Sequence, residues 1–475
     1  MKFSHLALLA AVVAAVFATT EAKAFPVALE PSKDNTLYDD GGAGLRSNGK
    51  GKDIFAGKTA GGGSIVRQRA VLAFEGLSLL PTPLTVNSAT LVLSLTKTIS
   101  GNQTVALHRL LADWGEGTSN ATSSEGQGVP ATTGDATWTH RFFNTATWSA
   151  PGGDFSGSAS ASRLVGSGSG PYAWNSTTLA TDVTGWISTP TTNFGWIVIG
   201  NEASGGSAKR FGSRESSAFS ERPRLVLDVT TPAPLDHFFC YKAKNSPGAF
   251  KFLKQNATIA DAIMPETVWQ LFKPVSLCTP ANKNNEGVTD EETHLEGYWT
   301  KAIKEVTVPP PTTTVSVTNQ FHLAEALVVK TGKLDRLLVP TSKCVDQPVG
   351  TCPLDLAPPA VDNPVDHYAC YKVTVSSNGP AFDPIPNVSV SDQFIDPAKD
   401  FTLSKPTHLC VAADKNQEGI KRPLYNLMCY KAEKALDAPA HVKQKKLHTS
   451  NQFGHERMDT LKEEELCVPS SIIVR

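Results

Sequence analysis

The chain has 475 residues and balances 44 Lys and Arg against 45 Asp and Glu, a formal net charge of -1. This balance argues against the clustered basic surface that nucleic acid binding needs, and it disfavours a role at a membrane surface. The length exceeds what one hydrophobic core supports, so several domains are expected.

An export signal is expected at residues 1–24. Lys2 precedes an apolar run, Leu6 to Phe17, that is too short to span a bilayer, and the small-residue site Ala22-Lys23-Ala24 follows it. No later stretch reaches the roughly 18 apolar residues of a transmembrane helix. We therefore expect a mature chain that starts at Phe25 and is secreted, extracellular or at the cell surface, without membrane insertion.

Residues 25–230 alternate apolar and small polar side chains. Leu91, Leu93 and Leu95 share one face of an expected strand, with Thr90 and Ser94 on the other. Clusters of Gly, Pro, Asn and Ser separate similar runs at residues 69–75, 104–111, 194–199 and 224–229. Many short strands with no convincing amphipathic helix between them predict an all-β fold, an antiparallel β-sandwich of the jelly-roll kind.

Eight short motifs in this region occur in the order typical of one family. They lie at residues 34–38, 69–74, 113–118, 136–138 with Trp148, 182–184, 193–196, 213–215 and 222–225. Together they resemble the DNRLRE domain, which is also classed as the family 96 carbohydrate-binding modules. Ala73 departs from the family, which has a basic residue on this strand.

The resemblance implies a β-sandwich attached to a secreted or cell-surface protein, with polysaccharide as its partner and acidic glycans favoured. A sugar ring stacks its apolar face on an aromatic side chain, and a uronic acid carboxylate suits arginine. The candidate ligand-binding residues are Arg67, Arg69, Trp138, Trp148, Tyr172, Lys209, Arg210 and Arg214. Alternatives are that the tryptophans lie in the core, that Arg214 pairs with Glu215, and that Arg69 covers the sheet edge with its apolar stem.

No cofactor is expected, although a structural Ca²⁺ is an alternative. Asp34, Asp39 and Asp40 offer oxygen ligands of the hardness that Ca²⁺ prefers. Their spacing matches no known loop signature, so we interpret them as turn-forming residues.

All eight cysteines follow a proline-containing linker at residues 231–235. The segment Asp236 to Lys242 returns as Asp366 to Lys372, and Lys273 to Cys278 returns as Lys405 to Cys410. Two disulfide-stapled, β-rich repeats are therefore expected, at residues 236–343 and 365–475, with an insertion at 344–364 between them. The region resembles an uncharacterised repeat of secreted bacterial proteins, which implies no activity.

Each repeat divides into two half-units, and this division predicts the disulfides. In the second half-unit Gly297 and Leu338 stand where the two cysteines belong, so both are missing together. Bridges between half-units would leave orphaned partners, so pairing within half-units is favoured over the other arrangements of eight cysteines. We predict Cys240 with Cys278, Cys370 with Cys410, Cys429 with Cys467, and Cys344 with Cys352 in the insertion.

Metal binding or redox chemistry is the rival interpretation of the cysteines. The chain has no CxxC pair, and an exported protein meets oxidising conditions, which favours disulfides. The repeated element at residues 282–287 and 414–419, Asn/Asp-Lys-Asn-x-Glu-Gly, is either a cation loop or a turn between strands, and we favour the turn.

Enzyme activity is not expected. The chain has no GxSxG or HExxH motif, and its histidines are scattered singly. The sequence therefore favours a secreted, non-catalytic carbohydrate-binding protein with other extracellular proteins as further partners. The alternative is a structural or adhesive surface protein in which the sandwich is a spacer that binds no sugar.

Overall fold

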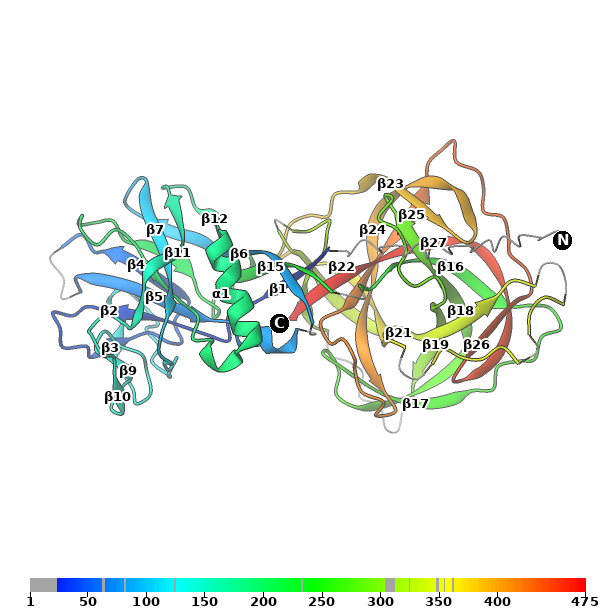
Figure 1. Ribbon diagram of the computed structural model, residues 1–475, viewed down its shortest axis with the longest axis horizontal. Helices are drawn as coiled ribbons and strands as arrows, with labels where there is room; N and C mark the ends of the chain where they lie inside the picture. The colour runs from blue at the N-terminus through cyan, green and yellow to red at the C-terminus, as the bar shows by residue number, and fades with distance from the viewer. Residues whose placement is uncertain are drawn as a thin grey trace, which may run out of the picture.

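The computed structural model describes residues 24–61, 65–80, 83–123, 125–231, 234–303, 312–323, 325–346, 350–353, 355–360 and 363–475. The expected signal lies outside the described residues, apart from Ala24, and so do Pro232 and Ala233 of the expected linker. The described chain forms two lobes (Figure 1) that consist almost entirely of antiparallel strands, which confirms the all-β fold class.

The N-terminal lobe has two sheet layers. One contains β1 (Ala24–Leu29), β15 (Arg224–Thr230), β6 (Thr85–Thr98), β12 (Gly170–Asn175), β14 (Lys209–Gly212) and β4 (Asp53–Lys58). The other contains β2 (Lys33–Tyr38), β5 (Arg67–Ala73), β13 (Trp196–Ile199), β7 (Gln103–Leu110) and β11 (Phe155–Val165). Because β4 pairs with both β14 and β5, it joins the layers at one edge.

Short elements complete this lobe. They are β3 (Arg46–Ser47), β8 (Val129–Pro130), β9 (His140–Phe142) and β10 (Ala146–Thr147), with 3-10 turns at Glu75–Leu79, Glu125–Gln127, Pro190–Thr192 and Phe219–Glu221. Leu91, Leu93 and Leu95 are buried between the layers, as the alternation predicts.

A helix that the sequence pattern does not predict covers one side of the lobe. This helix, α1 (Thr177–Ser188), begins where the Ser176 hydroxyl accepts a hydrogen bond from the Leu179 amide. Leu179, Val183 and Trp186 follow at helical spacing and are buried. The expectation that no amphipathic helix interrupts the strands is wrong, because three apolar residues among small polar ones are enough to anchor a short helix on a sheet.

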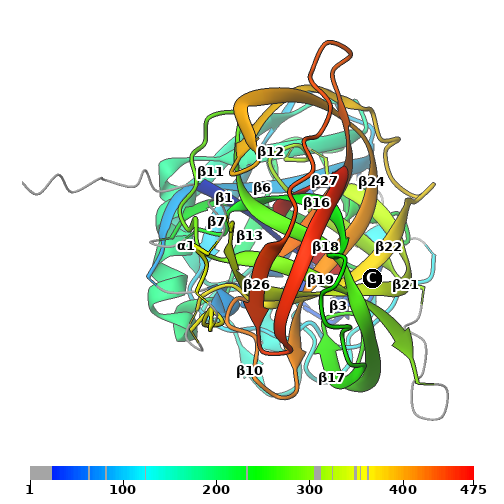
Figure 2. The ribbon, with the colours of Figure 1, turned by 90° about the vertical axis from the view of Figure 1, so that its right-hand side faces the viewer.

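The C-terminal lobe is a closed ring of eight antiparallel strands (Figure 2). In ring order they are β16 (His237–Asn245), β18 (Thr267–Lys283), β19 (His294–Ala302), β21 (Leu327–Cys344), β22 (His367–Val375), β24 (Ile395–Lys415), β25 (Asn426–Lys434) and β27 (Gly454–Val474), which pairs back to β16. Closing a sheet removes the exposed strand edges that would otherwise invite pairing with another chain.

Each half-unit adds one short strand to the ring. These strands are β17 (Gln255–Asp261), β20 (Thr314–Thr318), β23 (Ile385–Asp392) and β26 (Leu447–Asn451). Each pairs with the long strand of its own half-unit and with the long strand of the half-unit opposite, as β17 does with β18 and β24. The two sequence repeats therefore share one sheet and do not form two separate cores.

The four predicted disulfides are confirmed. Cys240 bonds Cys278, Cys370 bonds Cys410, Cys429 bonds Cys467, and Cys344 bonds Cys352. The first three bridges each join residues that face each other on neighbouring strands. Gly297 and Leu338 face each other at the equivalent place between β19 and β21, which explains why both cysteines are missing together.

The two lobes pack directly against each other. The ring of Phe25 stacks on Tyr425 with centroids 4.2 Å apart, and the Ala28 amide donates to the Ser471 hydroxyl over 3.0 Å. Glu30 contacts the guanidinium of Arg475. The two lobes therefore do not have independent cores, because Phe25 of β1 packs against Tyr425 and buried residues of both lobes form one cluster.

Candidate functional site

Arg67 and Arg69 both contact the ring of Trp138, and their guanidinium groups lie 4.9 and 4.8 Å from the ring centroid. Both arginines are already paired: Arg67 Nε lies 2.7 Å from Asp39, and Arg69 makes two hydrogen bonds to Glu202, of 2.6 and 2.9 Å. A guanidinium that is bound by a carboxylate of its own chain has little left for the carboxylate of a glycan.

The two tryptophans among the candidate sugar-binding residues are buried. Trp138 and Trp148 are 3% and 4% exposed and belong to one apolar cluster. The Trp148 indole N–H donates to the Thr137 carbonyl over 2.9 Å. The expectation that these rings are exposed to a sugar is wrong, because the loops that carry them fold back over the sheet formed by β2, β5 and β13.

The remaining predicted residues do not converge. Lys209 is fully buried and donates to the carbonyls of Ser100, Gly101 and Gly166. Arg210 is held by Thr96 and lies 3.4 Å from Asp53. The Tyr172 hydroxyl donates to the Gly168 carbonyl. These side chains stabilise turns and strand ends at separate places in the sandwich.

Arg214 belongs to a partly buried charge cluster with three carboxylates. Its guanidinium lies 3.0 Å from Glu215 and 3.1 Å from Glu116, and its amide donates to Asp34. Burial, followed by the negative charge of Glu215, raises the pKa of Asp34 well above its usual value. Arg214 and Lys50 supply the positive charge within this cluster, so the alternative interpretation of Arg214 as a structural ion pair fits the geometry.

The three aspartates considered for Ca²⁺ lie at different places. Asp39 pairs with Arg67, and Asp40 accepts hydrogen bonds from the backbone amides of Gly44 and Leu45. Asp34 lies in the charge cluster described above. Asp40 therefore acts as a turn residue, as the sequence favoured.

A small pocket lies where α1 ends against the start of β2, and we call it the Trp186 pocket. Its volume is about 270 Å³, and it is lined by Lys33, Glu75, Ser78, Asp113, Trp186, Pro190, Asn193 and Phe194. Asn193 is held by a hydrogen bond from its side-chain amide to the Phe74 carbonyl, and Phe194 by its carbonyl, which accepts from the Trp114 indole. Lys33 donates to Asp113 and to the Trp114 carbonyl.

Two buried polar atoms of this pocket's walls have no partner within the described part of the chain. They are the indole nitrogen of Trp186 and the side-chain oxygen of Asn193. The first can only donate a hydrogen bond, and the second can only accept one. Leaving such groups unsatisfied costs about 1–3 kcal/mol each.

Sequence reasoning did not identify this pocket. Asp113 and the Asn193-Phe194 pair lie in motifs that carry the family resemblance, yet none of the lining residues was among the candidates. Trp186 was assigned to the core, and it is indeed only 2% exposed. The clue that the sequence offered was that two of the quoted motifs bring polar and aromatic residues together at residues 113–118 and 193–196.

Two larger hollows adjoin β6, with volumes of about 740 and 730 Å³. In the first, the hydroxyls of Thr181 and Thr184 donate to backbone carbonyls of their own helix. The second is an open, mainly apolar groove between the lobes. Their walls contain none of the unpartnered buried atoms that mark the Trp186 pocket.

The centre of the C-terminal ring holds four polar residues at equivalent positions. Ser276, Arg336, His408 and Glu465 each stand two residues before Cys278, Leu338, Cys410 and Cys467, and all four are buried. Glu465 lies 2.6 Å from His408 Nδ1 and 3.1 Å from Arg336. Because Arg336 and Glu465 come from strands on opposite sides of the ring, this face of the sheet is its interior.

These contacts control the charge states of the cluster. Burial raises the pKa of Glu465, but Arg336 and His408 outweigh it and bring the pKa to about 2. Burial likewise lowers the pKa of His408, but the Glu465 carboxylate more than offsets this and the net shift is upward. The cluster is therefore an internally neutralised ion network that fills the ring.

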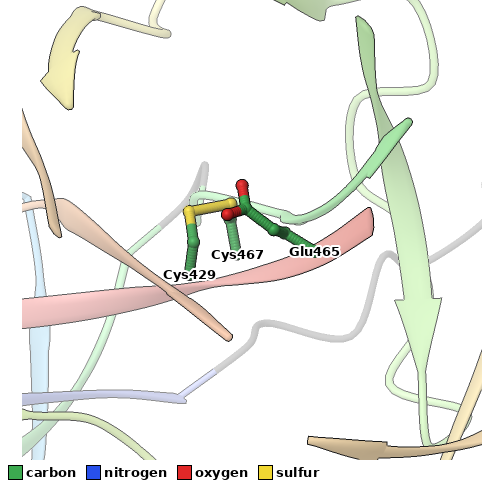
Figure 3. A group of neighbouring side chains, drawn as sticks. All are labelled: Cys429, Glu465 and Cys467. Atoms are coloured by element: carbon green, nitrogen blue, oxygen red, sulfur yellow. A yellow bond between two sulfur atoms is a disulfide. The ribbon is translucent and has the colours of Figure 1, made fainter. Parts of the chain in front are cut away.

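Glu465 also lies beside two sulfur atoms, of Cys429 and Cys467 (Figure 3). The sulfurs are bonded to each other, so they are not thiolates that could bind a metal. The disulfide interpretation therefore holds over the metal interpretation for these cysteines.

The repeated Asn/Asp-Lys-Asn-x-Glu-Gly element forms a turn. The Asn282 side chain accepts from the Gly287 amide, and Asn284 and Asn285 adopt left-handed backbone angles, with φ of 51° and 62°. Lys283 ion-pairs with Glu286, which also contacts His237 over 2.7 Å. Because a lysine already neutralises the glutamate, the turn is favoured over a cation loop.

No family model matches this chain, and no curated protein matches it. The likeness to the DNRLRE domain therefore stays a prediction from the residues. None of the helices in the described ranges is both long and apolar enough to cross a membrane.

Proposed function

We propose that the chain is a secreted, non-catalytic carbohydrate-binding protein whose N-terminal lobe holds a sugar in the Trp186 pocket. The observation that carries the proposal is that two residues lining this small pocket, Trp186 and Asn193, each have a buried polar atom without a partner among the described residues. A sugar hydroxyl both donates and accepts hydrogen bonds, so neighbouring hydroxyls of one ring can satisfy both atoms. Phe194 adds an aromatic side chain to the wall, suited to the apolar face of the ring.

The pocket favours a neutral sugar over an acidic one. Its walls contain two carboxylates, Glu75 and Asp113, and one cation, Lys33, which already binds Asp113 over 2.7 Å. A uronic acid would bring a third carboxylate close to these two and be repelled. The volume, about 270 Å³, is slightly below the roughly 300 Å³ at which pockets for drug-sized ligands begin, so it suits one sugar unit of a glycan.

A pair of serine substitutions tests this assignment in the full chain. Ser78 is an exposed residue of the pocket wall, and Ser78→Trp should fill the pocket without disturbing the core. Ser188 is an exposed serine at the end of α1 that does not line the pocket, so Ser188→Trp is the matched control. A glycan array, followed by affinity electrophoresis on the best ligand, measures binding, and thermal unfolding checks that both variants fold.

We expect Ser78→Trp to abolish glycan binding and Ser188→Trp to retain it. If Ser188→Trp is the variant that loses binding, the ligand lies in the hollow beside α1 and the Trp186 pocket is the wrong site. If the wild-type chain binds no glycan, the function as a structural or adhesive spacer replaces this proposal.

A further inference from the structure

Large apolar side chains are unusually exposed on two loops of the C-terminal lobe. In the loop at residues 246–254, Phe250 and Leu253 are 95% and 80% exposed. In the loop at residues 435–446, Leu436 and Val442 are 103% and 71% exposed. Among the described residues, these are four of the five most exposed large apolar side chains. Exposed apolar side chains that gather in one place commonly mark a surface that contacts another protein or a membrane.

The two loops are joined to each other. The Asp459 carboxylate on β27 accepts a hydrogen bond from the Ser246 hydroxyl over 2.6 Å and from the Lys446 amide over 2.9 Å. Asp459 also faces Lys244 across the β16–β27 pair. The two loops therefore adjoin each other at Ser246 and Lys446, and we call the surface that they form the loop face, defined as residues 246–254 and 435–446 with the adjoining ends of β16 and β27.

Lysines accompany the apolar side chains on the loop face. The two loops carry five lysines and one acidic residue, Asp437. All five are exposed: they are Lys251, Lys254, Lys443, Lys445 and Lys446. On the adjoining strands, Lys242 faces Lys462, whose ammonium group lies 3.9 Å from Glu464.

We infer that the loop face docks on an anionic lipid bilayer. Lysines near such a surface are attracted to its head groups, while apolar side chains at loop tips gain free energy by leaving water for the boundary with the acyl chains. A soluble polyanion would satisfy the lysines but would leave Phe250, Leu253, Leu436 and Val442 in water. The combination of both kinds of side chain on one face therefore favours a membrane surface as the partner.

The formal net charge of the whole chain disfavours a role at a membrane surface, but it does not describe the charge of the loop face. A formal charge of -1 averages over the whole chain, whereas docking depends on the charges within a Debye length of the bilayer, about 10 Å at 0.1 M salt. Peripheral docking by the loops is independent of sugar binding in the Trp186 pocket. Vesicles test the first, and glycans test the second.

Sedimentation with vesicles tests the inference on the full chain. The probes are vesicles of phosphatidylcholine with phosphatidylglycerol and vesicles of phosphatidylcholine alone. The wild type should sediment with the first and much less with the second, and the difference should shrink in high salt. The double variant Phe250→Ser/Leu253→Ser should lose roughly tenfold or more in affinity, since burying each such side chain is worth about that factor. The matched control, Ile99→Ser/Leu164→Ser, alters two exposed apolar residues of the other lobe and should bind as the wild type does.

A charge variant separates the membrane from other anionic partners. Lys443→Gln/Lys445→Gln should weaken vesicle binding by roughly fivefold for each lysine. The inference is overturned if the wild type does not bind anionic vesicles, or if the serine double variant binds them unchanged. If the lysine substitutions reduce binding while the serine substitutions do not, the loop face recognises a polyanion such as an acidic polysaccharide and not a bilayer.

Discussion

Replacing Glu465 by glutamine would remove the negative charge at the centre of the ring while keeping the shape of the side chain. Glu465 is 3% exposed and receives contacts from His408 over 2.6 Å and from Arg336 over 3.1 Å. In Glu465→Gln these two cations would remain buried beside each other without their shared counter-charge. The variant therefore tests whether the ion network holds the ring together.

The structure suggests the size of the effect. Removing one partner of a buried ion network costs about 3–5 kcal/mol, because the remaining charge is left uncompensated. Asp335, 3.4 Å from His408, compensates part of the remaining positive charge. We therefore expect the lower end of the range, a loss of about 3 kcal/mol in the free energy of unfolding of this lobe.

The loss should also depend on pH. The pKa of Glu465 is lowered from 4.5 to about 2, so its stabilising charge is complete above pH 4.5 and is lost as the pH falls through about 2. The pKa of His408 is raised above 6.5, so its contribution is complete below pH 6.5 and is lost as the pH rises through the folded-state pKa. The difference between the wild type and Glu465→Gln should thus be largest between pH 4.5 and 6.5.

Hydrogen exchange of the full, disulfide-intact chain measures this loss locally, through the amides of β24 and β27. The matched control is Glu433→Gln, which makes the same change in a glutamate that pairs with Lys431 at the surface and should leave exchange unchanged. The reasoning would be refuted if Glu465→Gln accelerated exchange in β24 and β27 no more than Glu433→Gln does.

Three further predictions concern the packing of the lobes. Replacing Cys240 and Cys278 together by serine should cost about 4 kcal/mol, and hydrogen exchange should rise in the second repeat as well as in the first, because both share one ring. If hydrogen exchange rose only in β16, β17 and β18, the conclusion that both repeats share one ring would be contradicted. Phe25→Ala should lower the free energy of unfolding by about 3 kcal/mol in urea denaturation, since Phe25 is 4% exposed and stacks on Tyr425; an unchanged value would show that the lobes are independent. Burial raises the pKa of Glu296 from 4.5 to about 8, so the stability that its neutral carboxyl provides is complete below pH 4.5 and is lost as the pH rises through about 8. Glu296→Gln should therefore exceed the wild type in urea midpoint above pH 8, and identical pH profiles would argue against this titration.

The strands and the disulfides can be predicted from the sequence, because the first depend on a local alternation of side chains and the second on which cysteines each half-unit contains. A period of two places Leu91, Leu93 and Leu95 on one face whatever lies opposite, and all three are buried. The joint loss of cysteines at Gly297 and Leu338 identified the pairing, since facing positions on neighbouring strands must change together. Each of these inferences needed only the order of residues within one half-unit or one strand.

Which charged and aromatic side chains are available to a ligand depends on contacts between residues that are distant in sequence. Arg67, Arg69 and Trp138 form one stack that includes Glu202, a residue more than sixty positions away in sequence, and no local pattern indicates that partner. The unpartnered atoms of the Trp186 pocket likewise depend on how α1 meets distant loops. The balanced net charge also concealed the lysines of the loop face, because a sum over the sequence carries no information about where the fold places each charge.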